Sequence, residues 1–338
     1  MHRLVTRAAV GLLIVATASI ATAQDSLGYR RSGRVVLNTR DNVLMMQLVR
    51  PLATQLAPSV ARVISNDRPV AYATIVTTDG YVLTKHSELS GDPIKVRLST
   101  GRRLPARVAA VRPSNDLALL KVESSEPLAA VQFHTESPAV GSFVITAGNI
   151  GRPIGLGVVG VSERPVQHTG RLGVVLRQSS GGGASVSEIY PNSGAEFAGI
   201  VKGDRIIAID GLQQPDHSSV KSTLGRYYPG DRVRLTIVRE GDQLEMNARI
   251  RDLSLMQETE NDAKVNGPRN ARLSGFDSVI QHDTVLDIDQ CGGPLLDTSG
   301  HVVGINIARA GRVVSYALPA TLLERETKAM LRDARRPD

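Results

Sequence analysis

Cysteine and large aromatic side chains are scarce in this chain of 338 residues. It contains one cysteine, no tryptophan, four phenylalanines and seven tyrosines. A single cysteine has no partner for an intrachain disulfide, so the hydrophobic core must hold the fold together. The formal net charge is +7, but Lys and Arg are spread along the sequence rather than gathered in one block. Without a basic block, and with few aromatic side chains to stack on bases, nucleic acid binding is not expected.

Sequence patterns that hold metals or phosphates are missing as well. No set of His, Cys, Asp or Glu has the spacing of a metal site, and the glycines at 181–183 are typical of a flexible loop rather than of a phosphate-binding turn. The sequence therefore predicts neither a metal nor an organic cofactor.

The N-terminus has the pattern of a cleaved export signal. Arg3 and Arg7 precede an apolar run over residues 8–20, and the small residues 21–23 fit a cleavage site. The apolar run is short for a bilayer span, so we expect residues 1–23 to be removed and the mature chain to have no membrane span. These features predict an exported protein, either periplasmic or secreted.

Residues 24–58 are expected to form an N-terminal arm followed by a helix. Leucines recur at every fourth position from 44 to 56, which places them along one side of a helix that Pro51 should kink or split. From residue 59 onward the sequence consists of short runs rich in Val, Ile and Leu, separated by Gly, Asp, Pro and Ser. This pattern favours a β-sandwich or a β-barrel.

A compact unit of different character, residues 168–251, interrupts the β pattern. Short strands and two short helices are predicted there, and residues 252–271, rich in Glu, Asn and Asp, are predicted as the return linker. The β pattern then resumes and ends in a predicted helix over residues 319–332, whose inward-facing side chains are Leu322, Leu323 and Met330. The chain fits two domains, or one large β fold with an insertion.

Several motifs carry a resemblance to a known family, and they follow one another in the family's order. They lie at residues 79–84, 115–122, 140–142 with 147–149, and 291–297 with 304–306. On these motifs the chain resembles the HtrA family of exported trypsin-like serine proteases with PDZ domains. The resemblance implies a mainly β fold, in which residues 59–165 and 272–335 form a trypsin-like double β-barrel.

The same resemblance implies the remaining organisation of the chain. The inserted unit, residues 168–251, would be an α+β PDZ domain, the active site would lie in the cleft between the barrels, and the protein would assemble as a homo-oligomer. The carboxylate-binding loop of the PDZ domain would be Arg171, Leu172, Gly173 and Val174. Backbone N–H groups of this loop would converge on the terminal carboxylate of a peptide, and the following strand would offer an edge for pairing. The expected partners are polypeptide C-termini or unfolded proteins.

The resemblance also assigns catalytic positions in the barrels. Asp116 takes the place of the aspartate that orients the base, and Cys291 takes that of the serine nucleophile, an exchange that permits covalent catalysis. The family's histidine falls seven residues after the glycine of the Asp-Gly-aromatic turn, which is Ser87 here. His86, the candidate base, is one residue short, and a shift of one residue turns a side chain to the opposite face of a strand.

The expected oxyanion site departs from the family pattern too. Its positions are Asp289 and Cys291, and the family has glycine in place of Asp289. A carboxylate there is expected to raise the pKa of the thiol and to oppose a developing oxyanion. We therefore favour an HtrA-like protein with impaired or absent peptidase activity that still binds peptides, in envelope quality control or as a scaffold. The alternatives are an active endopeptidase that uses Cys291, a thiol redox sensor, and a merely structural buried thiol.

Overall fold

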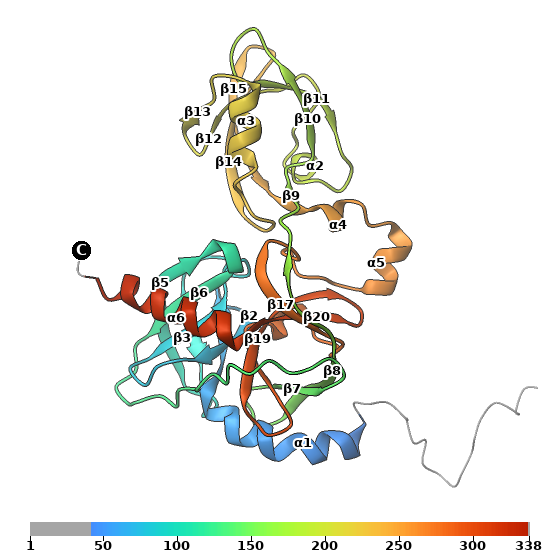
Figure 1. Cartoon of the computed structure of the whole chain (residues 1–338). Coiled ribbons are helices and arrows are strands. Elements are labelled where there is room, and N and C mark those ends of the chain that lie inside the picture. The colour runs from blue at the N-terminus through green and yellow to red at the C-terminus, as the bar shows by residue number, and fades with distance from the viewer. Residues whose placement is uncertain (1–41, 337–338) are drawn as a thin grey trace, which may run out of the picture. The chain divides into compact units, whose positions relative to one another are not determined.

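The computed structural model describes residues 42–336, so the predicted signal peptide and nearly all of the predicted arm lie outside the described residues. The fold is mainly β, as predicted. The first barrel closes in the order β1-β2-β3-β6-β5-β4 (Figure 1). Its strands are β1 (Val60–Ser65), β2 (Arg68–Ile75), β3 (Tyr81–Lys85), β4 (Ile94–Arg97), β5 (Arg103–Arg112) and β6 (Leu117–Val122). Buried Val, Ile, Leu and Ala side chains fill its interior.

Strands from both sides of the inserted unit form the second barrel. They are β7 (Phe143–Ala147), β8 (Pro153–Val166), β17 (Phe276–His282), β18 (Pro294–Leu296), β19 (Val302–Gly311) and β20 (Val314–Pro319). The barrel closes in the order β17-β20-β19-β18-β7-β8. β8 and β17 are paired, with Val166 opposite Phe276, although the whole insert lies between them in the sequence. The predicted double barrel is therefore confirmed.

The inserted unit has a sheet and a hydrophobic core of its own. The sheet consists of β10 (Val174–Gln178), β11 (Ala184–Ile189), β12 (Arg205–Ile209), β14 (Arg232–Arg239) and β15 (Asp242–Arg249), with β13 (Leu212–Gln213) beside β12. Helices α2 (Gly194–Phe197) and α3 (His217–Leu224) contact it. The sequence indicated one strand over residues 230–240, whereas the structure has the hairpin β14–β15. Most β15 side chains are exposed, so the strand lacks the hydrophobic alternation that would have revealed it.

Two short strands meet where the insert begins and ends. β9 (Gly170–Arg171) pairs with β16 (Arg251–Asp252). The segment that follows, predicted as a linker, holds two short helices, α4 (Leu253–Met256) and α5 (Glu260–Asn266). Asp252 accepts a hydrogen bond from Ser254 N at the start of α4, and Thr259 accepts one from Asp262 N at the start of α5. The polar side chains that suggested a linker thus act as helix caps.

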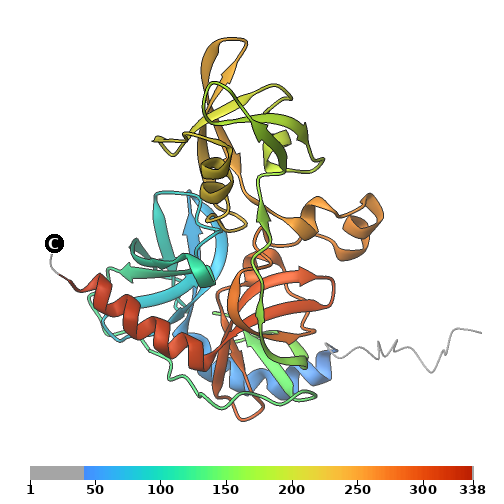
Figure 2. The ribbon, with the colours of Figure 1, turned by 45° about the horizontal axis from the view of Figure 1, so that its top comes forward.

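Two longer helices pack on the barrels. α1 (Val43–Leu56) runs unbroken through Pro51, contrary to a split at this residue, and buries Val49 and Ala53 beside β7 and β8. α6 (Ala320–Ala334) packs along the barrels (Figure 2), where it contacts β5, β6, β19 and β20. It buries Leu322, Leu323 and Met330, as predicted. No helix within residues 42–336 is long and apolar enough to cross a membrane.

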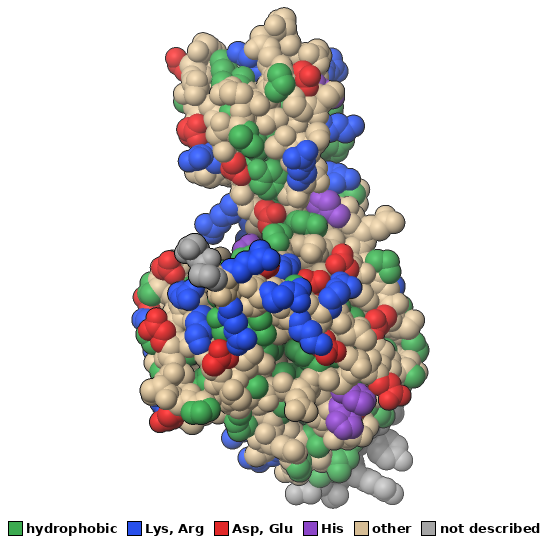
Figure 3. Space-filling view, turned by 60° about the vertical axis from the view of Figure 1, so that its left-hand side comes forward, with side chains coloured by type: hydrophobic (Ala, Val, Ile, Leu, Met, Phe, Trp, Pro, Cys, Tyr) green, Lys and Arg blue, Asp and Glu red, His purple; other side chains and the backbone are tan. Residues whose placement is uncertain are grey.

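Charged side chains on the surface are mixed in sign. Figure 3 shows a face on which Lys and Arg side chains gather in a band, with Asp and Glu side chains close by. α6 carries several ion pairs of this kind: Lys328 with Glu324 at 2.6 Å, and Arg112 of β5 with Glu326 at 3.4 Å. α6 contains three basic and three acidic side chains, so the helix carries no net charge.

Candidate functional site

The loop that carries Cys291 is held between the two barrels. It follows the 3₁₀ helix η3 (Ile288–Gln290) and leads into β18. The Cys291 carbonyl oxygen accepts a hydrogen bond from Tyr72 N in β2 over 2.7 Å, and Gly292 N donates to Asn306 O in β19 over 2.7 Å. Gly292 has a φ of +94°, and a Cβ there would lie 2.0 Å from the Tyr72 carbonyl oxygen. Only glycine fits this position, which fixes the backbone next to the thiol.

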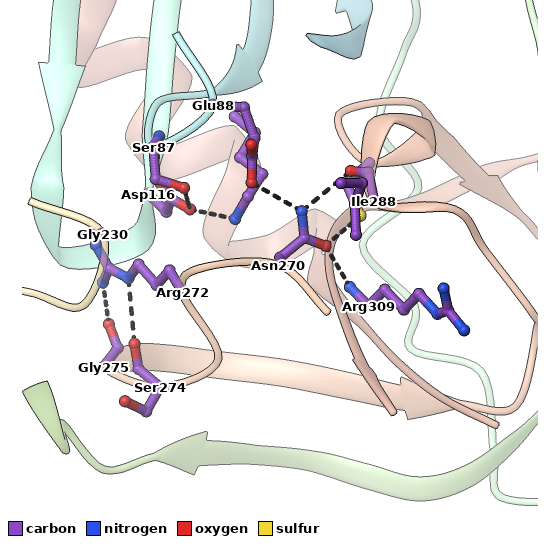
Figure 4. Close-up of polar contacts among 12 residues, drawn as sticks. Ser87, Glu88, Asp116, Gly230, Asn270, Arg272, Ser274, Gly275, Ile288 and Arg309 are labelled. Carbon is purple, nitrogen blue, oxygen red and sulfur yellow. Dashed lines mark hydrogen bonds and ion pairs between the residues drawn. The ribbon is translucent and has the colours of Figure 1, made fainter. Parts of the chain in front are cut away.

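Asp116 is fully buried, and both of its carboxylate oxygens have partners. The residue follows the 3₁₀ helix η2 (Pro113–Asn115) and has a left-handed φ of +56°. Its carboxylate pairs with the buried ammonium group of Lys85. Ser87 N donates to Oδ1 over 2.7 Å and Ser87 Oγ donates to Oδ2 over 2.9 Å (Figure 4). Burial alone would raise the pKa of Asp116, but Lys85 and then Arg272 outweigh it and lower the pKa.

His86 contacts Asp116 through its backbone and not through its imidazole. Its N–H donates to the Asp116 carbonyl oxygen over 2.8 Å. In the part of the chain that the structure describes, the imidazole of His86 makes no hydrogen bond with the Asp116 carboxylate or with Cys291. The carboxylate accepts from Ser87, and the thiol donates to Asn270. Ser87 contacts the carboxylate instead. A serine hydroxyl does not take up a proton near neutral pH as an imidazole does.

Asn270, from the segment that follows α5, covers the thiol of Cys291. Both side chains are buried, and Cys291 Sγ donates to Asn270 Oδ1 over 3.4 Å. The same oxygen accepts from Arg309 N at 2.7 Å, while Asn270 Nδ2 donates to Glu88 Oε1 at 2.9 Å and to Ile288 O at 3.0 Å (Figure 4). Asn270 N also donates to Arg309 O at 3.2 Å, so its backbone lies along β19.

Burial raises the pKa of the Cys291 thiol to about 12. Lys85 acts in the opposite direction, and Glu88 raises the pKa further. The thiol is therefore protonated near neutral pH, whereas the thiolate is the reactive nucleophile in acyl transfer. This environment differs from that of a catalytic cysteine, which is partly exposed and has a lowered pKa.

Asp289 turns its carboxylate toward the first barrel. It pairs with the guanidinium group of Arg62 in β1, whose Nη1 also donates to the Asp289 carbonyl oxygen over 3.0 Å. The Arg62 guanidinium lies over the ring of Tyr72, 4.5 Å from its centroid. The sequence predicted that Asp289 would raise the pKa of the thiol, but burial is the first cause of that shift. In the structure, Asp289 connects the loop that carries Cys291 to β1 of the first barrel.

Arg272 connects the covering segment to the loop that carries Asp116. Its side chain is only 1% exposed, and its guanidinium donates to Ser114 O over 2.8 Å and to the carbonyl oxygen of Pro113. The guanidinium also lies over the ring of Tyr228, 4.2 Å from its centroid. Because so many groups converge on it, Arg272 fixes the position of the segment around Asn270.

The inserted unit carries a groove of about 1050 Å³ between β10 and α3. All four residues of the predicted carboxylate-binding loop, Arg171, Leu172, Gly173 and Val174, line it. Gly173 has a φ of +86°, and a Cβ there would lie 2.2 Å from Ser193 Cβ, so glycine is required. β10 is the edge strand of its sheet. Such an edge can pair with an extended peptide.

Metal ligands are not clustered near either site. Within residues 42–336, no group of three or more His, Cys, Asp or Glu side chains is arranged to hold a metal ion.

Comparison with known families agrees with this geometry. A trypsin-like peptidase domain matches residues 71–209, and a PDZ domain matches residues 170–250. The barrels and the groove thus define a trypsin-like protease fold that carries a PDZ domain. Together with the DegP relatives, these two matches support the assignment of the chain to the HtrA family.

Individual relatives are distant. The chain is 22% identical over 285 residues to the periplasmic serine endoprotease DegP of Escherichia coli (strain K12). The matched region covers 58% of this chain and 59% of DegP. It is 35% identical over 94 residues to a probable periplasmic serine endoprotease DegP-like of Bartonella henselae, covering 27% of this chain and 18% of that protein. The chain thus spans less than two thirds of these relatives. The crystal structure of the MamO protease domain from Magnetospirillum magneticum (apo form) is similar at 20% identity, with a TM-score of 0.41, covering 80% of this chain and 96% of that one.

Two residues of the site were missed in the sequence. Lys85 continues the alternation of Tyr81 and Leu83 in β3, which places it on a buried face and could have marked it as an inward-pointing charge. Asn270 gave no local signal, because its contact with Cys291 depends on how the segment after α5 returns to the second barrel.

Proposed function

We propose that this chain is an exported HtrA-like protein that binds peptides or unfolded proteins through its PDZ domain and has impaired or no peptidase activity. Like its relatives named periplasmic, it acts outside the cytoplasm, in envelope quality control or as a scaffold. The observation that carries the proposal is the Asp116 carboxylate, whose oxygens are used by Lys85 and Ser87 where an active triad would orient an imidazole.

The nucleophile position supports the same proposal. A buried thiol with a pKa near 12 is almost never a thiolate at neutral pH, and Asn270 occupies the space next to its sulfur. Loss of the base costs roughly six orders of magnitude in kcat, and loss of the carboxylate that orients it roughly four, for enzymes of this mechanism. Together these features favour a barrel cleft that does not cleave peptides.

The groove of the PDZ domain supports retained binding. Its carboxylate-binding loop has the required glycine at 173, and β10 has an outer edge available for pairing. Binding through this groove does not depend on Asp116, His86 or Cys291. The protein can therefore recognise peptides without cleaving them.

A cleavage assay with binding measured in parallel tests the proposal. The mature protein is incubated with an unfolded casein-like substrate beside the variants Cys291→Ala and His86→Ala, and labelled peptides with free C-termini are titrated by fluorescence anisotropy. We expect no cleavage by any of the three proteins and saturable peptide binding by all of them. Cleavage by the unmodified chain that both substitutions abolish would establish the active cysteine endopeptidase instead.

The resemblance to the family also leads us to propose self-association as a homo-oligomer. Light scattering coupled to size-exclusion chromatography measures the molar mass directly. A mass of one chain at micromolar concentration would contradict this part of the proposal.

A further inference from the structure

Basic side chains predominate among the charged residues that line the peptide groove of the inserted unit. Its lining includes the basic residues Arg171, His217 and Lys221 and one acidic residue, Glu258. Glu258, the one acidic side chain, is neutralised, because it forms an ion pair with Arg269 at 2.8 Å and its side chain is only 14% exposed. The open groove therefore presents mainly positive charge to a ligand.

Lys221 is the cation best placed to act on a ligand. It lies on α3, is exposed, and forms no ion pair among residues 42–336. His217 is one turn earlier on the same helix, so both side chains lie on the face that lines the groove. Asp216, the nearest carboxylate in sequence, accepts from Ser219 N over 2.8 Å and caps the helix.

The direction of α3 relates these residues to positions along a bound peptide. Leu224 and Gly225, at the C-terminal end of α3, line the groove together with the carboxylate-binding loop. His168, whose Nδ1 accepts from Gly170 N of that loop, also contacts the backbone of Gly225. The C-terminal end of α3 is thus beside the place for the peptide's last residue, and the helix runs back along the peptide toward His217.

Helix and strand dimensions then give the register. Lys221 lies roughly 4.5 Å and His217 roughly 10.5 Å along the axis from Leu224, at about 1.5 Å per residue. An extended peptide advances about 3.3 Å per residue, so its third residue from the end lies roughly 6.6 Å from the last one. In a strand, alternate side chains point the same way, so the last and the third-last side chains both face the groove.

The terminal side chain meets an apolar environment. Leu172 and Leu224 are buried at this end of the groove, and Met256 of α4 adds a wall from outside the sheet. The third-last side chain instead falls between Lys221 and His217 of α3.

Resting on the proposed peptide-binding function, we propose that this groove selects free C-termini with an aspartate or glutamate as the third-last residue, read by Lys221 and His217. The terminal carboxylate and the apolar last residue anchor the peptide, and the acidic side chain adds a charge-assisted contact with the ammonium group of Lys221. Peptides with lysine or arginine at that position are disfavoured by like-charge repulsion.

Anisotropy titrations of the full mature chain test this inference. Three labelled peptides share one sequence with an apolar last residue and differ only in Glu, Gln or Lys as the third-last residue. We expect the Glu peptide to bind about fivefold more tightly than the Gln peptide, and the Lys peptide to bind most weakly. Lys221→Gln should remove the difference between Glu and Gln, and Lys221→Glu should reverse the order of Glu and Lys.

Lys202→Glu is the matched control, because Lys202 is exposed in the same domain and does not line the groove. This variant should keep the order of the unmodified chain. Equal affinities of the three peptides for the unmodified protein would overturn the inference while leaving the proposed function intact. Failure of every peptide in an unbiased set of C-terminal sequences to bind would overturn the proposed function itself.

Discussion

The Cys291 thiol donates a hydrogen bond to Asn270 Oδ1, 3.4 Å from its sulfur, and the two residues come from separate segments of the second half of the chain. Asn270 reaches this position because Arg309 N, Glu88 and Ile288 O satisfy the rest of its amide. The sulfur is thereby kept from solvent, which determines how the thiol should react.

Replacing Asn270 by Ala should expose the thiol. The substitution removes all four hydrogen bonds of the Asn270 side chain, each worth about 0.5 to 1.5 kcal/mol, so we expect thiol labelling by a small disulfide reagent to be at least about tenfold faster. Asn247→Ala, at an exposed position of β15, should leave the rate unchanged, and Cys291→Ala should abolish labelling. An unchanged rate in a folded Asn270→Ala protein would contradict the covering role of Asn270.

Replacing Lys85 by Met should destabilise the first barrel. The substitution leaves the buried Asp116 carboxylate without its cation, which costs about 3 to 5 kcal/mol in the free energy of unfolding. Urea denaturation measures the loss, and adding Asp116→Asn to Lys85→Met should recover much of it. Lys95→Met breaks the exposed pair with Asp67 and should cost less than about 1 kcal/mol. Similar losses in the free energy of unfolding for Lys85→Met and Lys95→Met would show that the buried ion pair contributes no more to stability than the exposed one.

Replacing Arg272 by Lys should also be costly. A lysine retains the charge but lacks the planar guanidinium that spans the carbonyl oxygens and stacks on Tyr228, so we expect a loss of about 2 to 4 kcal/mol in the free energy of unfolding. Arg234→Lys, at an exposed residue of β14, should change stability by less than about 0.5 kcal/mol. Thiol labelling of Cys291 should also accelerate in Arg272→Lys, because the segment that holds Asn270 is released.

Cys291 should make stability fall at alkaline pH. Its pKa is about 12 in the folded chain, above the ordinary value of 9.0. Because the folded-state pKa is the higher one, the stabilising contribution is fully present below pH 9 and is lost as pH rises toward 12, where the unfolded chain ionises first. Between about pH 8 and pH 10.5 the unmodified chain should lose about 2 kcal/mol more than Cys291→Ala. If the free energy of unfolding changed equally with pH in the unmodified chain and in Cys291→Ala, the burial of the thiol would be contradicted.

The barrels and the C-terminal helix were predictable because their signals are local or periodic. Runs such as the one in β3 and the inward positions Leu322, Leu323 and Met330 follow from short-range patterns. β15 was missed because seven of its eight side chains are not buried, so no alternation marks it.

The chemistry of the site was only partly predictable. The spacing from Gly80 put Ser87 at the position of the family's histidine, and in the structure Ser87 contacts Asp116. The direction of the Asp289 side chain could not be inferred, because its partner Arg62 lies in the other barrel. Contacts between residues far apart in sequence are determined by the completed fold, and no local sequence pattern predicts them.

The pairing of β8 with β17 across the insert also constrains how the chain acquires its structure. Because β17 to β20 follow the insert along the chain, the second barrel cannot close before the whole insert has been synthesised. Once the insert has folded, β9 and β16 bring its ends together, which shortens the loop that must close between Val166 and Phe276. A substitution in the sheet of the insert that unfolds this unit should therefore slow maturation of the second barrel as well.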